Sequence, residues 1–254
     1  MELLPIHTPT FVAGDNLAQV LCTHANFSDG DILVLSSKAL ATTEGAAMEI
    51  HDTSASDEAR VLAKQHRREP GFCQAVLDET VRMNGEVIAS ANGFLLTELQ
   101  PNGMQDGSIL VPNAGLDRSN VEQTHTVGWP KDPVTSLRKL RDDIRSTSGA
   151  NIALVLSDSS IAPRRKGVVA FALCVCGFDP FISLKGTSDI FGHALQVTEE
   201  ASADQLATAA NMVMGNSNQS VPAAIVREHG IAFSDFCGWV PGIRREEDLY
   251  HGVI

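Results

Sequence analysis

Aromatic side chains and long hydrophobic runs are both scarce in this chain of 254 residues. It has ten Phe, two Trp and one Tyr against a hydrophobic fraction of 43%, so the core must be mostly aliphatic. The longest apolar run, residues 168–178, is too short to cross a bilayer, which needs about 20 residues. The first residues show no basic stretch followed by an apolar one, so we expect neither a signal peptide nor a membrane partner.

Positive charge is also in short supply. Nineteen Lys and Arg stand against 31 Asp and Glu, which gives a formal net charge of −12. General binders of nucleic acid or of membrane surfaces need a basic face, so we expect neither kind of partner. The length and the apolar content suit a globular protein, and we expect one domain over residues 1–254 or two closely packed subdomains.

Several familiar catalytic motifs are missing. The sequence has no Walker A motif, no Gly-x-Gly-x-x-Gly loop, no Gly-x-Ser-x-Gly elbow and no zinc-type spacing among its eight His. Of the five Cys, only Cys174 and Cys176 lie close together in sequence. We expect these two to be inert core thiols, kept reduced in the cytoplasm.

Helix and strand signals alternate irregularly along the chain. Apolar spacing predicts helices over residues 16–25, 57–68, 133–146 and 203–214, and the helical pattern of the second continues over residues 72–81. Asp15 is the predicted N-cap of the first helix, Asp132 that of the third and Ser202 that of the fourth. Strands are predicted over residues 31–36, 151–156, 167–176 and 223–226, and short strands between Asn-Gly and Asp-Gly turns over residues 87–111. This mixture favours an α+β fold over a doubly wound sheet.

Two carboxylates stand where predicted strands give way to loops. Asp117 lies among small and polar residues after a strand-like segment, and Asp158 follows the apolar residues 152–156. Paired carboxylates with nearby hydroxyl and amide oxygens suit a hard cation such as Mg²⁺ or Mn²⁺. The alternative is that both residues only shape turns.

The most basic segment of the chain, residues 162–167, begins four residues after Asp158. Cations beside a bound metal are a common way to hold polyphosphate, because each neutralises oxygen charge. A solvated basic turn is the alternative.

One longer run has a specific counterpart. Residues 111–121, Val-Pro-Asn-Ala-Gly-Leu-Asp-Arg-Ser-Asn-Val, resemble the signature of the coenzyme F420-0:L-glutamate ligase family, the γ-glutamyl ligases of deazaflavin biosynthesis. Further blocks follow the family's order: residues 14–18, 30–34, 37–38, 44–45, 132–133, 158–159, 186–189, 192 and 201–207. The resemblance covers most of residues 8–229.

This resemblance implies a fold, a reaction and partners. The fold would be the family's own α+β fold, with mixed and antiparallel sheets, flanking helices and an intertwined homodimer. In the family, a nucleoside triphosphate activates a carboxylate as an acyl phosphate, and the amine of an amino acid then forms the amide. The expected reaction joins L-glutamate to coenzyme F420-0 with GTP, or with ATP instead. Mg²⁺ or Mn²⁺ is the expected cofactor, and the family pattern allows a monovalent cation.

The resemblance also assigns roles to residues. The implied metal ligands are Asp117, Asp158, Ser159 and Asn216. The implied nucleotide contacts are Thr8, Pro9, Thr10, Phe11, Ser37, Thr42, Asn120, Met214, Gly215 and Asn216. Asp117, Asp158 and Arg165 are the expected catalytic residues.

The chain departs from the family at substrate-facing positions. Thr42 stands where the family has a phosphate-contacting Lys, Ala162 where it has an Arg, and Arg164 where it has a Trp. These changes leave three alternatives open: a ligase for a different acid, a nucleotide-binding or regulatory protein without turnover, and a metal-dependent phosphohydrolase.

Overall fold

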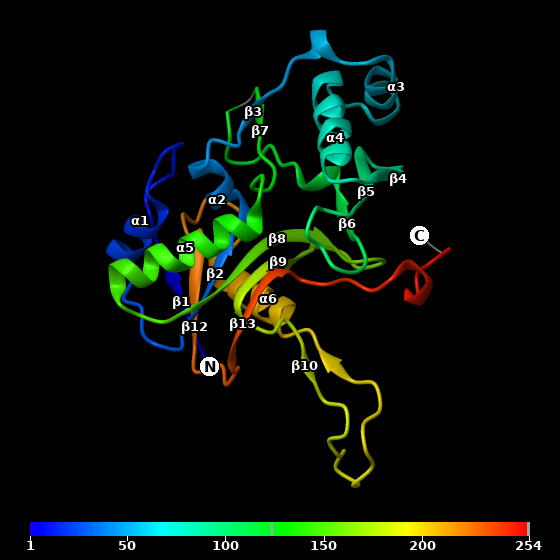
Figure 1. The fold of residues 1–254 in the computed structure, drawn as a ribbon. Helices are drawn as coiled ribbons and strands as arrows, with labels where there is room; N and C mark the ends of the chain where they lie inside the picture. The colour runs from blue at the N-terminus through cyan, green and yellow to red at the C-terminus, as the bar shows by residue number, and fades with distance from the viewer. Residues whose placement is uncertain (123, 253–254) are drawn as a thin grey trace.

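The sheet at the centre of the molecule has six strands in the order β1-β12-β2-β8-β9-β13 (Figure 1). These are seen in a computed structural model that describes residues 1–122 and 124–252. The strands are β1 Glu2–Ile6, β2 Ile32–Ser36, β8 Ala153–Ile161, β9 Val168–Phe178, β12 Ala223–Arg227 and β13 Phe233–Trp239. Only β2 and β8 run parallel; every other neighbouring pair in this sheet is antiparallel.

Helices cover both faces of this sheet. α1 (Leu17–His24) and α5 (Pro133–Ser148) pack on one face, and α6 (Ser202–Met214) packs on the other (Figure 1). Because side chains alternate along a strand, Leu33 and Leu35 of β2 enter the first core, while Ile32 and Val34 enter the second. The apolar run of β2 thus reflects burial on both faces.

A second group of elements lies beside the sheet. Helices α3 (Asp57–His66) and α4 (Pro70–Arg82) pack near a three-stranded sheet, β4 (Glu86–Ala91), β5 (Phe94–Leu99) and β6 (Ile109–Pro112) (Figure 1). The remaining elements are short: α2 Ser37–Thr43, β3 Met48–Glu49, η1 Asp52–Ser54, η2 Asn113–Gly115, β7 His125–Thr126, β10 Ile182–Ser183, β11 Glu199–Glu200 and η3 Arg245–Glu247. β10 and β11 form the base of an arm that projects from the body.

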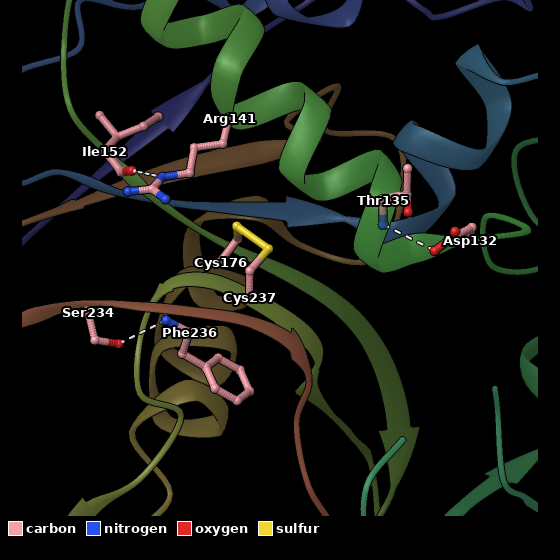
Figure 2. Close-up of a disulfide and its surroundings, with 8 residues drawn as sticks. All are labelled: Asp132, Thr135, Arg141, Ile152, Cys176, Ser234, Phe236 and Cys237. Atoms are coloured by element: carbon pink, nitrogen blue, oxygen red, sulfur yellow. Dashed lines mark hydrogen bonds between the residues drawn. A yellow bond between two sulfur atoms is a disulfide. The ribbon is translucent and has the colours of Figure 1, made fainter. Parts of the chain in front are cut away.

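The predicted α+β class with a mixed sheet is confirmed, and so is the Asp132 cap of α5, whose side chain accepts a hydrogen bond from the amide of Thr135 (Figure 2). Two other predicted caps are wrong. Asn16, not Asp15, accepts the amide of Gln19 at the start of α1, because Asp15 instead accepts the amide of Val12. Ser202 is the first residue of α6 and donates its hydroxyl to the carbonyl of Pro180.

One strand extends beyond its predicted bounds, and another is not predicted. β8 continues through the polar residues 157–160 to Ile161, because β9 pairs with it that far and supplies their backbone hydrogen bonds. β13 was not predicted at all, since its sequence Phe-Ser-Asp-Phe-Cys-Gly-Trp lacks a clean alternation. Among the described residues, none of the helices combines the length and the apolar character that a bilayer crossing requires.

The expected reduced state is wrong for one cysteine of the Cys174/Cys176 pair. Strand β13 places Cys237 directly opposite Cys176 of β9, and the two form a disulfide (Figure 2). The sequence separation of 61 residues hides this neighbour. Cys174 stays a free, buried thiol, and burial raises its pKa well above the ordinary value.

Candidate metal and nucleotide site

The site forms where the parallel pairing of β2 and β8 ends. Ser36 of β2 lies opposite Ser157 of β8. Both strands run in the same direction, so the residues that follow them meet at one edge of the sheet, the usual place for ligands in such arrangements. Lys38, the second residue of α2, and Asp158 therefore come together at this edge although 120 residues separate them.

Asp117 reaches the same place from the three-stranded sheet. Its backbone exchanges two hydrogen bonds of 2.9 Å with Val127, and the Thr126 hydroxyl donates to its carbonyl. Its carboxylate accepts hydrogen bonds from the Lys38 ammonium and from the amide and hydroxyl of Ser119, both at 2.7 Å. Asp117 is thus held at the backbone and at the side chain.

Asp158 has a different environment. Its Oδ2 accepts a hydrogen bond of 2.6 Å from the indole Nε1 of Trp129, and its Oδ1 accepts one of 2.8 Å from the amide of Ser159. Burial raises the pKa of Asp158 to about 6, against the opposing effect of these hydrogen bonds and of the Lys38 charge; the charge of Asp117 raises it further.

The pKa of Asp117 is shifted in the opposite direction, below its ordinary value. Burial alone would raise its pKa, but the hydrogen bonds and charge of Lys38, with the donors of Ser119, lower it below the ordinary value. Lys38 thus acts on both carboxylates, and Asp117 acts on Asp158. Lys38 is hydrogen-bonded to Asp117, and the charges of both groups act on the nearby Asp158.

The donor set fits a hard divalent cation. Asp117 and Asp158 supply carboxylate oxygens, the ligands that Mg²⁺ prefers together with phosphate and water. Ser160 lies two positions beyond Asp158 on the same strand face, and its buried hydroxyl has no hydrogen-bond partner within the described chain. Over the residues that the structure describes, no three His, Cys, Asp or Glu side chains gather as a complete site. Phosphate and water would therefore have to complete the coordination.

The other two expected metal ligands are Ser159 and Asn216. Ser159 alternates with Asp158 and pairs with Ala170, whose side chain belongs to the α6 core, so its hydroxyl faces away from the Asp158 carboxylate. Asn216 is exposed in the segment after α6. Their roles stay predictions.

The expected nucleotide contacts come from four segments, and three of them touch one another. The amide of Thr8 donates to the carbonyl of Ser220 at 3.1 Å, and the Asn120 side chain donates to the carbonyl of Ser217 at 3.5 Å. Residues 8–11, the loop of Asn120 and the segment after α6 thus lie together. Thr8 is buried, while Pro9 and Thr10 are exposed.

Some of these side chains are committed to the core. Met214 ends α6 with its side chain in the second core, so any nucleotide contact there must come from its backbone. Gly215 follows with φ +73°, and a methyl group at this position would lie 2.6 Å from Gln219. Phe11 packs partly against the first core. Ser37 is buried at the start of α2, and Thr42 is half-buried in its last turn.

The basic segment occupies the exposed turn of the β8–β9 hairpin. Arg164 has φ +58°, and the amide of Arg165 donates to the carbonyl of Ala162. Within the described residues, Arg164, Arg165 and Lys166 make no ion pair. The turn follows Ile161, the last residue of β8, and so lies a few residues beyond Asp158. The catalytic role expected for Arg165 stays a prediction.

Sequence reasoning missed two residues of this site. Lys38 lies in the Ser37-Lys38 block that the family resemblance includes, so its position carried a signal that was not read as a function. Trp129 gave no such signal, because it joins Asp158 only through the fold across 29 residues.

The raised pKa of Asp158 leads to a prediction about metal binding. At pH 7 a carboxyl with a pKa of about 6 is mostly ionised, and at pH 5 it is mostly protonated. A proton on the carboxylate competes with the metal, so we expect Mn²⁺ to bind about tenfold more weakly at pH 5 than at pH 7. Equilibrium titration with Mn²⁺, followed by electron paramagnetic resonance, measures this. An affinity that is flat over this range contradicts Asp158 as a ligand.

Known proteins resemble this chain over nearly its full length. The F420-0:Gamma-glutamyl ligase family matches residues 5–228. Coenzyme F420:L-glutamate ligase of Methanocaldococcus jannaschii is 31% identical over 252 residues, covering 98% of this chain and 96% of the relative. The enzymes of the same name from Methanothermobacter thermautotrophicus and Archaeoglobus fulgidus are each 32% identical, covering 96% and 91% of this chain and 96% and 89% of the relatives. This chain belongs to the F420-0:γ-glutamyl ligase family.

Proposed function

We propose that this protein is an acid–amino-acid ligase that uses a nucleoside triphosphate, most directly GTP, and a divalent metal to couple L-glutamate to coenzyme F420-0. The single observation that carries the proposal is the placement of two carboxylates, Asp117 paired with Lys38 and the buried Asp158, at the edge where the parallel pairing of β2 and β8 ends. Family membership supplies the reaction class, and the named relatives supply the substrate pair.

The residues divide the work by their chemistry. Asp117 and Asp158 would hold Mg²⁺ or Mn²⁺, which when bound supplies charge neutralisation for the phosphates. Transfer of the γ-phosphoryl group to the substrate carboxylate gives an acyl phosphate and the nucleoside diphosphate. Attack by the glutamate amine then forms the amide and releases phosphate. Lys38 would turn its ammonium from Asp117 to a phosphate oxygen, where it takes over the charge that Thr42 cannot supply.

The test is the dependence of nucleotide cleavage on both co-substrates. Release of inorganic phosphate from GTP should require the acid, glutamate and Mg²⁺ or Mn²⁺ together, and the amide of the acid with the glutamate amine should appear in equal amount. Cleavage without an acid or an amine would favour a phosphohydrolase. Nucleotide binding without any cleavage would favour a regulatory protein, the reading that Thr42 supports. Turnover with another acid in place of F420-0 would retain the ligase and change its substrate.

We propose that the basic turn holds the acid substrate. Arg165 carries an exposed guanidinium that can form a bidentate pair with a carboxylate or phosphate. Replacing Arg164 or Arg165 by Ala should then weaken binding of the acid or the nucleotide by about 1.5–3 kcal/mol, the range for charged hydrogen bonds. Calorimetric titration of each variant with GTP, ATP and candidate acids measures this. Unchanged affinity for every ligand would make the turn a solvated surface feature.

We propose that the protein is a homodimer and that the arm, residues 182–200, contributes to its interface. The arm carries Ile190, Phe191 and Val197, which are 93%, 78% and 81% exposed. The Lys185–Glu199 ion pair and the contact between the His193 ring and the Asp189 carboxylate brace it without covering these side chains. A protruding apolar surface of this kind marks an association site.

The variant Ile190→Asp/Phe191→Ser should therefore be a monomer at micromolar concentration, while the unaltered protein sediments as a dimer. The fold should persist, because both side chains lie outside the two cores. A monomeric unaltered protein, or a variant that still dimerises, contradicts this interface.

A further inference from the structure

The indole of Trp129 binds one proposed metal ligand, Asp158, and packs beside the segment that leads to the other, Asp117. Its ring is 3% exposed, and its Nε1 donates the 2.6 Å hydrogen bond to Oδ2 of Asp158. Trp129 follows Val127 by two residues, and Val127 holds the backbone of Asp117. One buried side chain thus lies next to the segments that carry the two carboxylates.

Close packing fixes the ring from two further sides. A methyl group built at Gly115 would lie 2.7 Å from the indole, so the ring packs directly on the backbone two residues before Asp117. On another side, the ring of Trp239 lies with its centroid 6.1 Å away and its plane tilted by 54°. Trp239 is itself held, because its Nε1 donates to the carbonyl of Asn102. The Trp129 N–H therefore points at Asp158 with little freedom.

This geometry leaves the Asp158 carboxylate oriented but available. The Ser159 amide binds Oδ1 and the Trp129 indole binds Oδ2, so the carboxylate plane is set by one donor on each oxygen. Each carboxylate oxygen can accept more than one partner, so a cation can still bind. A ligand held in this way does not have to be ordered when the metal arrives, and partners of this kind are a recognised determinant of metal affinity.

We propose that Trp129 is a positioning residue that orients Asp158 for binding of the divalent metal. This inference rests on the proposed function, because it requires that Asp158 binds a metal. The competing explanation is that Trp129 only fills the core between the sheet and the Asp117 loop.

The experiment compares Trp129→Phe with Trp239→Phe. Both variants replace a buried indole by a phenyl ring and remove one N–H donor, but only the first removes the donor to Asp158. Mn²⁺ affinity, measured by electron paramagnetic resonance without nucleotide or substrate, should fall 10–100-fold in Trp129→Phe, the range for partners of a metal ligand. In Trp239→Phe, where a phenyl ring still packs against Trp129 and the N–H donor to Asp158 is kept, it should stay within about threefold. Equal affinities in the two variants would overturn the proposal, because a residue that only fills the core would give the same result at either position.

A second measurement needs no change at Trp129. The chain has two tryptophans, so its nitrogen-labelled protein has two indole N–H resonances, and Trp239→Phe assigns them. Mg²⁺ should shift the Trp129 resonance and leave that of Trp239 in place. If Mg²⁺ shifts neither resonance while Mn²⁺ binds, the metal does not bind at Asp158, and the proposal fails.

These readouts separate this proposal from the proposed function. If the unaltered protein binds no Mn²⁺ at neutral pH, the metal-dependent function fails and the positioning role falls with it. If the unaltered protein binds Mn²⁺ and Trp129→Phe binds it equally well, the function stands and only the role of Trp129 is lost.

Discussion

Replacing Asp117 by Asn is expected to weaken Mn²⁺ binding by at least about 100-fold. Loss of a residue that only hydrogen-bonds to a metal ligand costs up to about 100-fold, and loss of a ligand itself should cost no less. The change removes a negative charge from the site and leaves the Lys38 ammonium without its carboxylate partner. Both effects disfavour a second cation at this edge of the sheet. Metal-dependent binding of GTP should be lost together with Mn²⁺ binding.

The fold should survive this change. The side chains of Asp117 and Lys38 are 48% and 25% exposed, and a solvated ion pair of this kind contributes little to stability. The backbone bonds between Asp117 and Val127 do not depend on the carboxylate. The Tm of the variant should therefore match that of the unaltered protein, and a large loss of Tm would mean that the binding result reports unfolding.

Asp204→Asn is the matched control. Asp204 is a half-buried carboxylate on α6, and it accepts a hydrogen bond from the amide of Ala172. An Asn oxygen can accept the same bond. We expect unchanged Mn²⁺ affinity in this variant, and a comparable loss in both variants would show that the effect of Asp117→Asn comes from net charge alone.

Replacing Arg227 by Met is expected to lower the free energy of unfolding by about 3 kcal/mol, the cost of leaving one member of a buried ion pair alone. Asp31, just before β2, has a side chain that is 1% exposed and accepts two hydrogen bonds from Arg227, at 2.8 and 2.7 Å. The amide of Ser28 is its other donor. Without the guanidinium, a buried carboxyl group is left beside a single neutral donor.

Thermal unfolding measures the result. For a chain of this size, a loss of about 3 kcal/mol corresponds to a Tm roughly 6–12 °C lower. Lys139→Met serves as the control, because Lys139 pairs with Asp143 on the exposed side of α5 and such pairs contribute a few tenths of a kcal/mol. Similar Tm values for Arg227→Met and Lys139→Met would contradict a stabilising role for the Asp31 pair.

Asp117→Asn and Arg227→Met affect opposite ends of β2. Asp117 pairs with Lys38, just after β2 ends, and Asp31 lies just before β2 begins. Asp117→Asn should therefore change metal binding at constant Tm, and Arg227→Met should change Tm while the folded protein still binds Mn²⁺.

Local sequence signals determined much of this protein. The Asp132-Pro133 pair sets the start of α5 and Gly149 its end, because each residue suits the backbone required there. The continuous apolar run of β2 indicates a strand, and the signature around Asp117 identifies the family. These features depend on residues that are neighbours in the chain, so they can be predicted from the sequence alone.

The tertiary structure decided the contacts between distant residues. The pairing of β13 with β9 joins Cys176 to Cys237, and the end of β2 brings Lys38 to Asp117 across 79 residues. The Trp129 hydrogen bond to Asp158 arises in the same way. Each of these contacts depends on which strands are adjacent and in what register, and that choice is made by burial over the whole sheet. No local pattern of residues records it.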